Sequence, residues 1–204
     1  WGRRAVIAWT EAGAPRRVRA RVFAPLDLPE PTGSATPGPA AVAAARMQPG
    51  TPLPDVEVAR IDGPAPLGLG MLRGTPTVVS FFASWCAPCQ DEFPILSRLA
   101  REHGDALHVV GISIDEGPTS RVAAFAREHA LTYVVAHDLD GSAAQAFGVP
   151  PSPATFVFDA SGELTHRYVG GGPETLEALP GAVAEALRSA AEEHPAHGGH
   201  GHPH

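Results

Sequence analysis

The sequence predicts an α/β domain in which a mixed central sheet carries helices on both faces. From residue 51 onward, segments with strand character alternate with segments of helical periodicity, and residues 107–114 are almost continuously apolar. Such apolar runs are typical of strands that are covered on both faces of a sheet. A chain of 204 residues with 44% hydrophobic residues can also bury one substantial core. We therefore expect one folded α/β domain with extensions at its ends.

The elements of this domain are predicted from hydrophobic periodicity and from glycine-containing turns. In chain order they are strand 56–61, a turn at Asp62-Gly63, strand 76–83, helix 87–103, strand 107–114, helix 118–129, strand 132–136, helix 142–147 ending at Gly148, strand 154–158, a turn at Ser161-Gly162, strand 164–169 and helix 174–191. Helices that connect parallel strands imply right-handed crossovers. The two strands around the second turn are expected to form a hairpin.

The last helix is expected to direct an apolar stripe toward the sheet. The residues of this stripe recur at helical spacing and are Leu176, Leu179, Val183 and Leu187. Pro180-Gly181 falls inside the same helix and is expected to kink or break it. Outside the helices, His137 and His166 are expected at the surface, near the ends of strands.

The two ends of the chain differ in composition from the middle. We assign residues 1–30 to an N-terminal extension, 31–49 to a Pro/Gly/Ala-rich linker, 50–192 to the folded domain and 193–204 to a flexible His-rich tail. Within the extension, strict alternation over residues 17–22 predicts a strand with three arginines on one face. That face could contact an anionic membrane surface or lie in solvent, and both interpretations stay open at this point.

Charge is distributed unevenly along the chain. Residues 1–50 carry seven arginines and three acidic residues, a net charge of +4, whereas residues 51–204 carry eight arginines and nineteen acidic residues, a net charge of −11. Nucleic-acid binding requires clustered positive charge, so the acidic body excludes nucleic acid as the main partner. The apolar residues 5–9 are too few for a signal-peptide core, so targeting is not readable from the sequence.

The two cysteines of the chain form a Cys-x-x-Cys motif in the sequence Trp85-Cys86-Ala87-Pro88-Cys89. The motif follows a predicted strand and opens a predicted helix, which places the two sulfurs within disulfide reach. The N-terminus of a helix stabilises a thiolate, the form of cysteine that attacks disulfides. Cys86 is therefore the expected nucleophile, and Pro88 is expected to stiffen the turn between the sulfurs.

A structural role for the cysteine pair is less consistent with the sequence. A structural zinc site needs four ligands, and residues 90–190 contain neither a second Cys-x-x-Cys motif nor a pair of histidines at matching spacing. A disulfide that closes so small a loop constrains the unfolded chain only weakly. The pattern therefore indicates thiol redox chemistry.

Three local motifs together resemble the TlpA/ResA-like branch of the thioredoxin superfamily. The segment 82–94 around the cysteines is similar to the active-site signature of that branch, and 148–156 is similar to its cis-proline loop. Residues 52–55 together with Asp62-Gly63 resemble its N-terminal entry hairpin. The resemblance covers residues 50–190 and implies a thioredoxin fold with an N-terminal hairpin extension and the activity of an extracytoplasmic thiol-disulfide oxidoreductase.

The resemblance also implies roles for individual residues. Cys86 and Cys89 are expected to form the redox disulfide, and Glu92 lies three residues after Cys89 on the same helical face. Partial burial is expected to raise the pKa of Glu92, so that it can exchange a proton with Cys89; the alternative is a surface glutamate. Pro153 matches the cis proline of the family and Ser152 the preceding partner-contacting residue, while a trans turn is the alternative.

Trp85 and the C-terminal histidines are further candidates for binding. Trp85 is expected either to cover the nucleophile and contact the substrate protein or to lie in the core. The tail histidines can bind Zn, Cu or Ni as neutral imidazoles, and they are His194, His197, His200, His202 and His204. An inert tail and a purification remnant are the alternatives.

We expect from these residues a reductant of protein disulfides that needs no cofactor. The resemblance implies a membrane thiol carrier as electron donor and apocytochrome c as one substrate, within cytochrome c maturation. One alternative is a peroxide-reducing enzyme, which would need a Pro-x-x-x-Thr-x-x-Cys context, whereas Ser84 and Trp85 precede Cys86 here. Another is a metal-binding or metal-delivery module that uses the cysteines and the His tail, although similar copper chaperones have a Cys-x-x-x-Cys pair.

Overall fold

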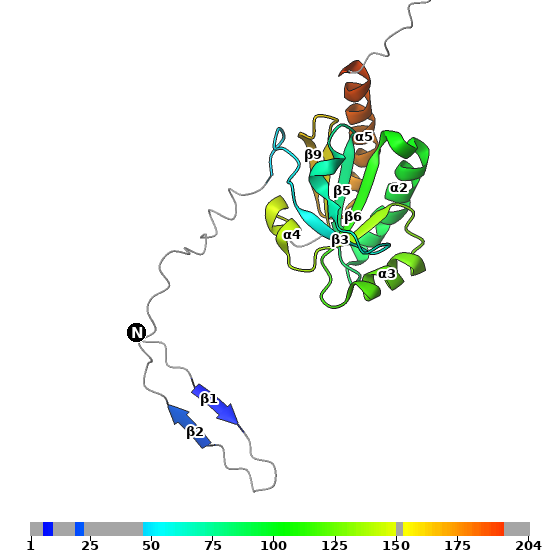
Figure 1. Cartoon of the computed structure of the whole chain (residues 1–204). Helices are drawn as coiled ribbons and strands as arrows, with labels where there is room; N and C mark the ends of the chain where they lie inside the picture. The colour runs from blue at the N-terminus through cyan, green and yellow to red at the C-terminus, as the bar shows by residue number, and fades with distance from the viewer. Residues whose placement is uncertain (1–5, 10–18, 23–46, 150–152, 194–204) are drawn as a thin grey trace, which may run out of the picture. The chain divides into compact units, whose positions relative to one another are not determined.

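The computed structural model describes residues 6–9, 19–22, 47–149 and 153–193 (Figure 1). Strands β1 (Val6–Trp9) and β2 (Arg19–Val22) pair antiparallel in a two-stranded sheet of their own. The strand predicted for the alternating arginine segment is thus confirmed over Arg19–Val22.

A seven-stranded mixed sheet forms the centre of the domain in the part of the chain from residue 47 onward. Its strand order is β4-β3-β7-β6-β5-β8-β9. The strands are β3 (Glu57–Arg60), β4 (Leu67–Gly68), β5 (Thr77–Phe82), β6 (His108–Ser113), β7 (Val134–His137), β8 (Ala154–Phe158) and β9 (Leu164–Val169). The helices are α2 (Ala87–His103), α3 (Thr119–Glu128), α4 (Ser142–Phe147) and α5 (Pro173–Glu193), with short 3-10 helices at Leu69–Leu72 and Gly104–Ala106.

The topology confirms the predicted thioredoxin-like α/β fold. β5 pairs in parallel with β6 and antiparallel with β8, and β6 pairs in parallel with β7. The expected hairpins are both present: β3 pairs with β4 at the N-terminal side, and β8 pairs with β9. None of the helices in the described ranges is long and apolar enough to cross a membrane.

Apolar side chains of alternating strand residues hold the helices on the two faces of the sheet. Val78 and Phe82 of β5 face α2, α3 and α5, whereas Phe81, one residue away, packs against Phe147 of α4. The rings of Phe81 and Phe147 meet edge to face at a centroid distance of 5.0 Å. Figure 1 accordingly shows α4 on the opposite side of the sheet from α2 and α3. The prediction of helices on both faces is therefore confirmed.

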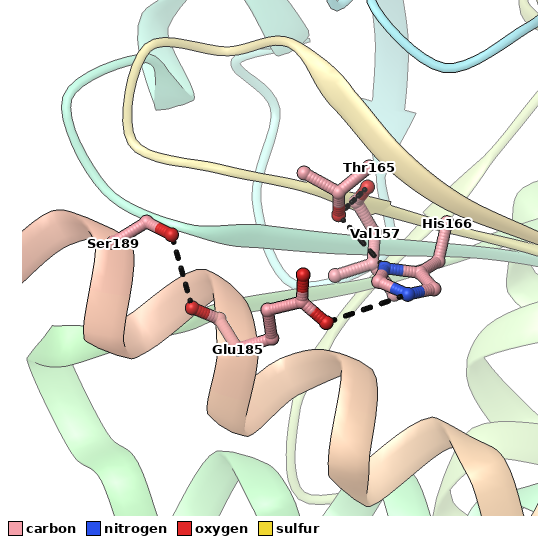
Figure 2. Close-up of polar contacts among 5 residues, drawn as sticks. All are labelled: Val157, Thr165, His166, Glu185 and Ser189. Atoms are coloured by element: carbon pink, nitrogen blue, oxygen red, sulfur yellow. Dashed lines mark hydrogen bonds and ion pairs between the residues drawn. The ribbon is translucent and has the colours of Figure 1, made fainter.

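Helix α5 packs against the edge strand β9. Figure 2 shows the polar contacts there: the His166 Nε2 atom lies 3.7 Å from Glu185 Oε2, and its Nδ1 atom lies 3.2 Å from Thr165 Oγ1. The Thr165 hydroxyl donates to the Val157 carbonyl at 3.0 Å, and the Ser189 hydroxyl donates to the Glu185 carbonyl at 3.3 Å. The contact of His166 with Glu185 thus joins β9 to α5.

The expectation that His137 lies at the surface is wrong. His137 lies in the interior, only 1% exposed, because its Nε2 atom is 2.7 Å from the Asp115 carbonyl and its Nδ1 atom 3.1 Å from Thr119 Oγ1. These partners satisfy both ring nitrogens and so allow a polar ring to be buried. His166, by contrast, reaches the surface, with its side chain 33% exposed. Helix α5 runs unbroken through Pro180, so of the expected kink or break the break is absent, and a kink stays a prediction.

Gly111 of β6 provides room for an aromatic ring above the sheet. A Cβ atom at this position would lie 2.8 Å from Tyr133 Cε2 and 3.3 Å from Phe82 Cε1. Real Cβ atoms do not approach ring carbons this closely, so only glycine fits there without displacing the rings. The Tyr133 side chain therefore lies over the strand that neighbours β5.

We expect Gly111→Ala to destabilise the domain by about 1–3 kcal/mol, because overpacking must displace the rings of Tyr133 and Phe82. Urea unfolding measures the free energy of unfolding. Gly63→Ala is the matched control, because a Cβ atom there would meet nothing within 4 Å. Equal stability of the two variants would show that the Tyr133 ring is free to move aside.

Candidate functional site

The two cysteines meet at the start of α2. Cys86 is the N-cap residue of this helix, and the Cys86 and Cys89 sulfurs form a disulfide with a Cα to Cα distance of 5.4 Å. The Cys89 amide donates a hydrogen bond to Cys86 Sγ at 3.3 Å. An amide aimed at the sulfur, together with the helix N-terminus, favours a thiolate at Cys86 once the disulfide is reduced. The geometry therefore agrees with Cys86 as the nucleophile.

Trp85 lies at the surface next to the disulfide. Its side chain is 72% exposed, so the alternative that it belongs to the core is wrong. A cleft of about 620 Å³ opens beside it and is also lined by Ser84, Asp115, Glu116 and the face of α3. An exposed aromatic residue beside a cleft offers contact area to a partner protein. The role of Trp85 in substrate contact stays a prediction.

Glu92 lies on the side of α2 that faces the sheet and is only 1% exposed, so the alternative of a surface glutamate is wrong. Its Oε2 atom accepts hydrogen bonds from Thr155 Oγ1 at 2.8 Å and from Ser80 Oγ at 3.3 Å. Burial raises the pKa of Glu92 above its ordinary value, and the two hydroxyl donors only partly oppose this. A carboxyl group with a raised pKa is suited to accept or release a proton near neutral pH.

The hydroxyl partners of Glu92 come from neighbouring positions of two paired strands. Ser80 of β5 stands opposite Thr155 of β8, and the Thr155 hydroxyl lies 3.0 Å from that of Ser80. On the other side Ser80 stands opposite Gly111, over which Tyr133 lies. The pKa of Tyr133 is raised, mainly by burial and to a lesser extent by the charge of Glu92. The sequence analysis missed Ser80 and Thr155, although each is a hydroxyl residue within an otherwise apolar strand.

Pro153 is buried where β8 begins, close to the start of α2. A Cβ atom on Gly171 would lie 2.5 Å from the Pro88 carbonyl oxygen and 3.0 Å from Pro153 Cγ, so this glycine packs against both prolines. The Gly170 amide also donates to the Pro153 carbonyl at 2.9 Å. Ser152 lies outside the described residues, so its contact role and the cis bond remain predictions. Gly171 was missed, although the run of three glycines at 170–172 could have indicated a close approach of backbone.

Metal binding by the tail also remains a prediction. The five tail histidines lie outside the described residues. Within the described ranges, no group of three or more His, Cys, Asp or Glu side chains is arranged to hold a metal ion. The two cysteines therefore have no additional metal ligands among those side chains.

Comparison with known proteins agrees with this geometry. The family model Redoxin matches residues 48–185. Thiol-disulfide oxidoreductase ResA of Oceanobacillus iheyensis is 32% identical over 114 residues, which are 55% of this chain and 58% of that protein. The match to this curated relative thus spans less than two thirds of its length.

Two solved structures are similar over nearly their whole length. A thiol:disulfide interchange protein assigned as DsbE from Chlorobium tepidum superimposes with a TM-score of 0.64 and 27% identity, covering 69% of this chain and 99% of its own. A secreted disulfide oxidoreductase of Mycobacterium tuberculosis, homologous to DsbE of E. coli, gives 0.56 and 28% identity, with coverage of 64% and 96%. The same fold thus carries thiol-disulfide chemistry in these proteins.

We expect Glu92→Gln to remove a loss of stability that the wild type shows as the pH rises above 4.5. Because the pKa of Glu92 is raised on folding, the folded state holds this proton at pH values where the unfolded chain has released it. The free energy of unfolding should therefore fall more steeply with rising pH in the wild type than in Glu92→Gln.

Urea unfolding of the oxidised proteins at pH 4.5 and 7.5 measures this difference. Other titrating groups are shared by both proteins and cancel in the comparison. Glu102→Gln is the control on the same helix, because Glu102 is exposed, and it should follow the wild type. Parallel pH profiles of the wild type and Glu92→Gln would contradict the raised pKa.

Proposed function

The chain belongs to the Redoxin family and is a thiol-disulfide oxidoreductase, and on this premise we propose that it reduces disulfide bonds in protein substrates outside the cytoplasm. The observation that carries the proposal is the Cys86–Cys89 disulfide at the start of α2, with the buried carboxyl group of Glu92 one turn further along. The disulfide can accept and release two electrons, and the carboxyl group can handle the accompanying proton.

The reaction starts from the reduced dithiol. The Cys86 thiolate attacks one sulfur of the substrate disulfide, forms a mixed disulfide and expels the other substrate sulfur as a thiolate. The Cys89 thiol then loses its proton and attacks Cys86 Sγ, which releases the second substrate thiolate. Two electrons have passed to the substrate, and the Cys86–Cys89 disulfide that the structure contains is the product.

Glu92 is proposed to take the proton from Cys89 in the second step. A carboxylate accepts a proton best when its pKa lies near the working pH, and burial raises the pKa of Glu92 in that direction. The hydroxyl groups of Thr155 and Ser80 hold the carboxyl group in place beneath α2. A carboxyl group that is already correctly oriented transfers a proton faster than one that must first be ordered.

The substrate is proposed to bind across the exposed face of the site. Trp85 supplies an exposed aromatic surface on one side of Cys86, and the backbone edge just before Pro153, ahead of the fully paired strand β8, is proposed to supply the other. An extended segment of a partner protein can pair with such an edge through its backbone. The cleft beside Trp85 would accommodate side chains of that segment.

We infer the biological setting from the relatives. The resemblance to TlpA/ResA-like proteins supports a role in cytochrome c maturation, with apocytochrome c as substrate and a membrane thiol carrier as electron donor. The similarity to a secreted oxidoreductase supports a place outside the cytoplasm. Oxidised protein must then be reduced again after each turnover, which requires an electron donor.

Equilibration of the Cys86–Cys89 pair with dithiothreitol or glutathione tests the direction of electron flow. We expect a reduction potential near or below that of thioredoxin, about −270 mV. A potential near that of DsbA, about −120 mV, would instead identify a donor of disulfides and would falsify the proposed direction.

Single-cysteine variants test the order of attack. Cys89→Ser should accumulate a mixed disulfide with a protein substrate such as insulin, because no second thiol remains to resolve it. Cys86→Ser is the matched control and should form no adduct, because the remaining Cys89 is buried with an exposure of 1%. Non-reducing electrophoresis detects the adduct, and an adduct formed only by Cys86→Ser would reverse the two roles.

A further inference from the structure

Asp115, which follows β6, is hydrogen-bonded to the loop that carries the nucleophile. Both oxygens of its carboxylate accept hydrogen bonds from the Ser84 amide, at 3.1 and 3.0 Å. One of them also accepts a hydrogen bond from the Ser84 hydroxyl at 2.8 Å. The Ser113 hydroxyl donates to the same carboxylate at 2.7 Å. Asp115 thus holds two hydrogen-bond donors of Ser84, a residue from which it is separated by 31 positions in the sequence.

Ser84 stands two residues before the nucleophile in a loop of fixed shape. Chain geometry limits the distance between the Cα atoms of Ser84 and Cys86 to about 7.6 Å. The Cys86 amide donates to the Ala83 carbonyl at 3.0 Å, and the Gln90 side-chain amide lies 3.4 Å from the Ser84 carbonyl. A carboxylate bound to Ser84 is therefore close enough to act on the charge of a Cys86 thiolate.

Asp115 is itself held from behind by His137. The buried ring of His137 lies with Nε2 at 2.7 Å from the Asp115 carbonyl, so Nε2 is the protonated nitrogen and donates to it. Its Nδ1 atom lies 3.1 Å from the Thr119 hydroxyl. This contact fixes the backbone of Asp115, from which its carboxylate reaches Ser84.

Two electrostatic effects of Asp115 act in the same direction. Its negative charge disfavours a second negative charge at Cys86, and it occupies the amide and hydroxyl of Ser84, which could otherwise solvate that charge. Both effects oppose the Cys89 amide and the helix N-terminus, which favour the thiolate. A less stable thiolate makes the reduced form less stable and the dithiol a stronger reductant, as the contrast with strongly oxidising proteins shows.

We propose that Asp115 is a positioning residue that acts through Ser84 to hold the Cys86 loop and to keep the Cys86–Cys89 pair strongly reducing. The proposal rests on the proposed function, because it explains why the pair would donate electrons instead of accepting them. It concerns the difference in potential between variants, whereas the proposed function concerns the potential of the wild type. The two can therefore fail separately.

Other charged groups surround the same site and define the controls. Glu92 approaches from beneath α2, and the cleft beside Trp85 is lined by Glu116, Arg121 and Glu128 as well as Asp115. Glu116 adjoins Asp115 in sequence and is exposed, and within the described residues it makes no hydrogen bond to the Cys86 loop. Glu116→Gln therefore removes the same charge from the same cleft without releasing Ser84.

The test is the equilibrium of the Cys86–Cys89 pair with glutathione at pH 7 in four proteins: wild type, Asp115→Asn, Asp115→Ser and Glu116→Gln. Asp115→Asn should shift the equilibrium constant about tenfold toward the dithiol, which corresponds to a potential more oxidising by ~30 mV. Asp115→Ser also removes the carboxylate and should shift the equilibrium constant in the same direction. Glu116→Gln should stay within twofold of the wild type.

Ser84→Ala separates the two effects of Asp115. In the wild-type background it should change the equilibrium constant by less than twofold, because the hydroxyl is already held by Asp115. In the Asp115→Ser background it should reverse part of the shift, because the shorter side chain releases the Ser84 hydroxyl, which is one of the groups that stabilise the thiolate. This coupling is a double-mutant cycle and would not arise from a general loss of packing.

Any of three results overturns the proposal. They are an unchanged equilibrium constant in a folded Asp115 variant, a shift toward the disulfide in such a variant, or an equal shift in Glu116→Gln. Thermal unfolding of each oxidised variant shows which of them are folded. A wild-type potential near that of a disulfide donor would overturn the proposed function but leave the difference between variants as a separate result.

Discussion

Strand β5 is the element on which the whole site depends, because it is hydrogen-bonded on both sides and ends at the reactive loop. It pairs in parallel with β6 and antiparallel with β8, so the carboxyl ends of β5 and β6 and the start of β8 meet at the same end of the sheet. This end of the sheet carries Cys86 after β5, Asp115 after β6 and Pro153 before β8. Three distant segments of the chain thereby meet around the loop and helix start that carry the cysteine pair.

The interior between α2 and the sheet is mainly apolar but also contains the polar side chains of Glu92, Ser80 and Thr155. Burying a carboxyl group costs free energy unless it is hydrogen-bonded, and here hydroxyls of two adjacent strands supply the bonds to Glu92. The remaining cost appears as a raised pKa, which is the property that proton transfer needs. A local departure from the rule of apolar interiors is typical of functional sites.

Two carboxylates approach the cysteine pair from different elements and in different surroundings. Glu92 of α2 is buried among hydroxyl groups, whereas Asp115 is half-buried beside a cleft and holds a backbone amide. The first is suited to exchange a proton, and the second to fix the loop and its charge. The neighbouring helix N-terminus acts in the opposite sense to Asp115, so the potential of the pair reflects a balance between them.

The sequence by itself determined the order of strands and helices and the position of the cysteine pair. These features are local: hydrophobic periodicity predicts each element, and Cys-x-x-Cys at the start of a helix specifies a thiol site wherever the helix packs. The burial of Glu92 was also predictable, since its spacing from Cys89 fixes the helical face that it shares.

Only the tertiary structure decided which distant residues complete the site. Ser80, Thr155, Asp115 and Gly171 carry no local signal strong enough to identify a partner, because a hydroxyl, a carboxylate or a glycine is common in strands and turns. Their roles follow from strand register and from the approach of the loop at 170–172 to Pro88. The same applies to His137, expected at the surface, since an imidazole is buried only where both nitrogens find partners, here Asp115 and Thr119.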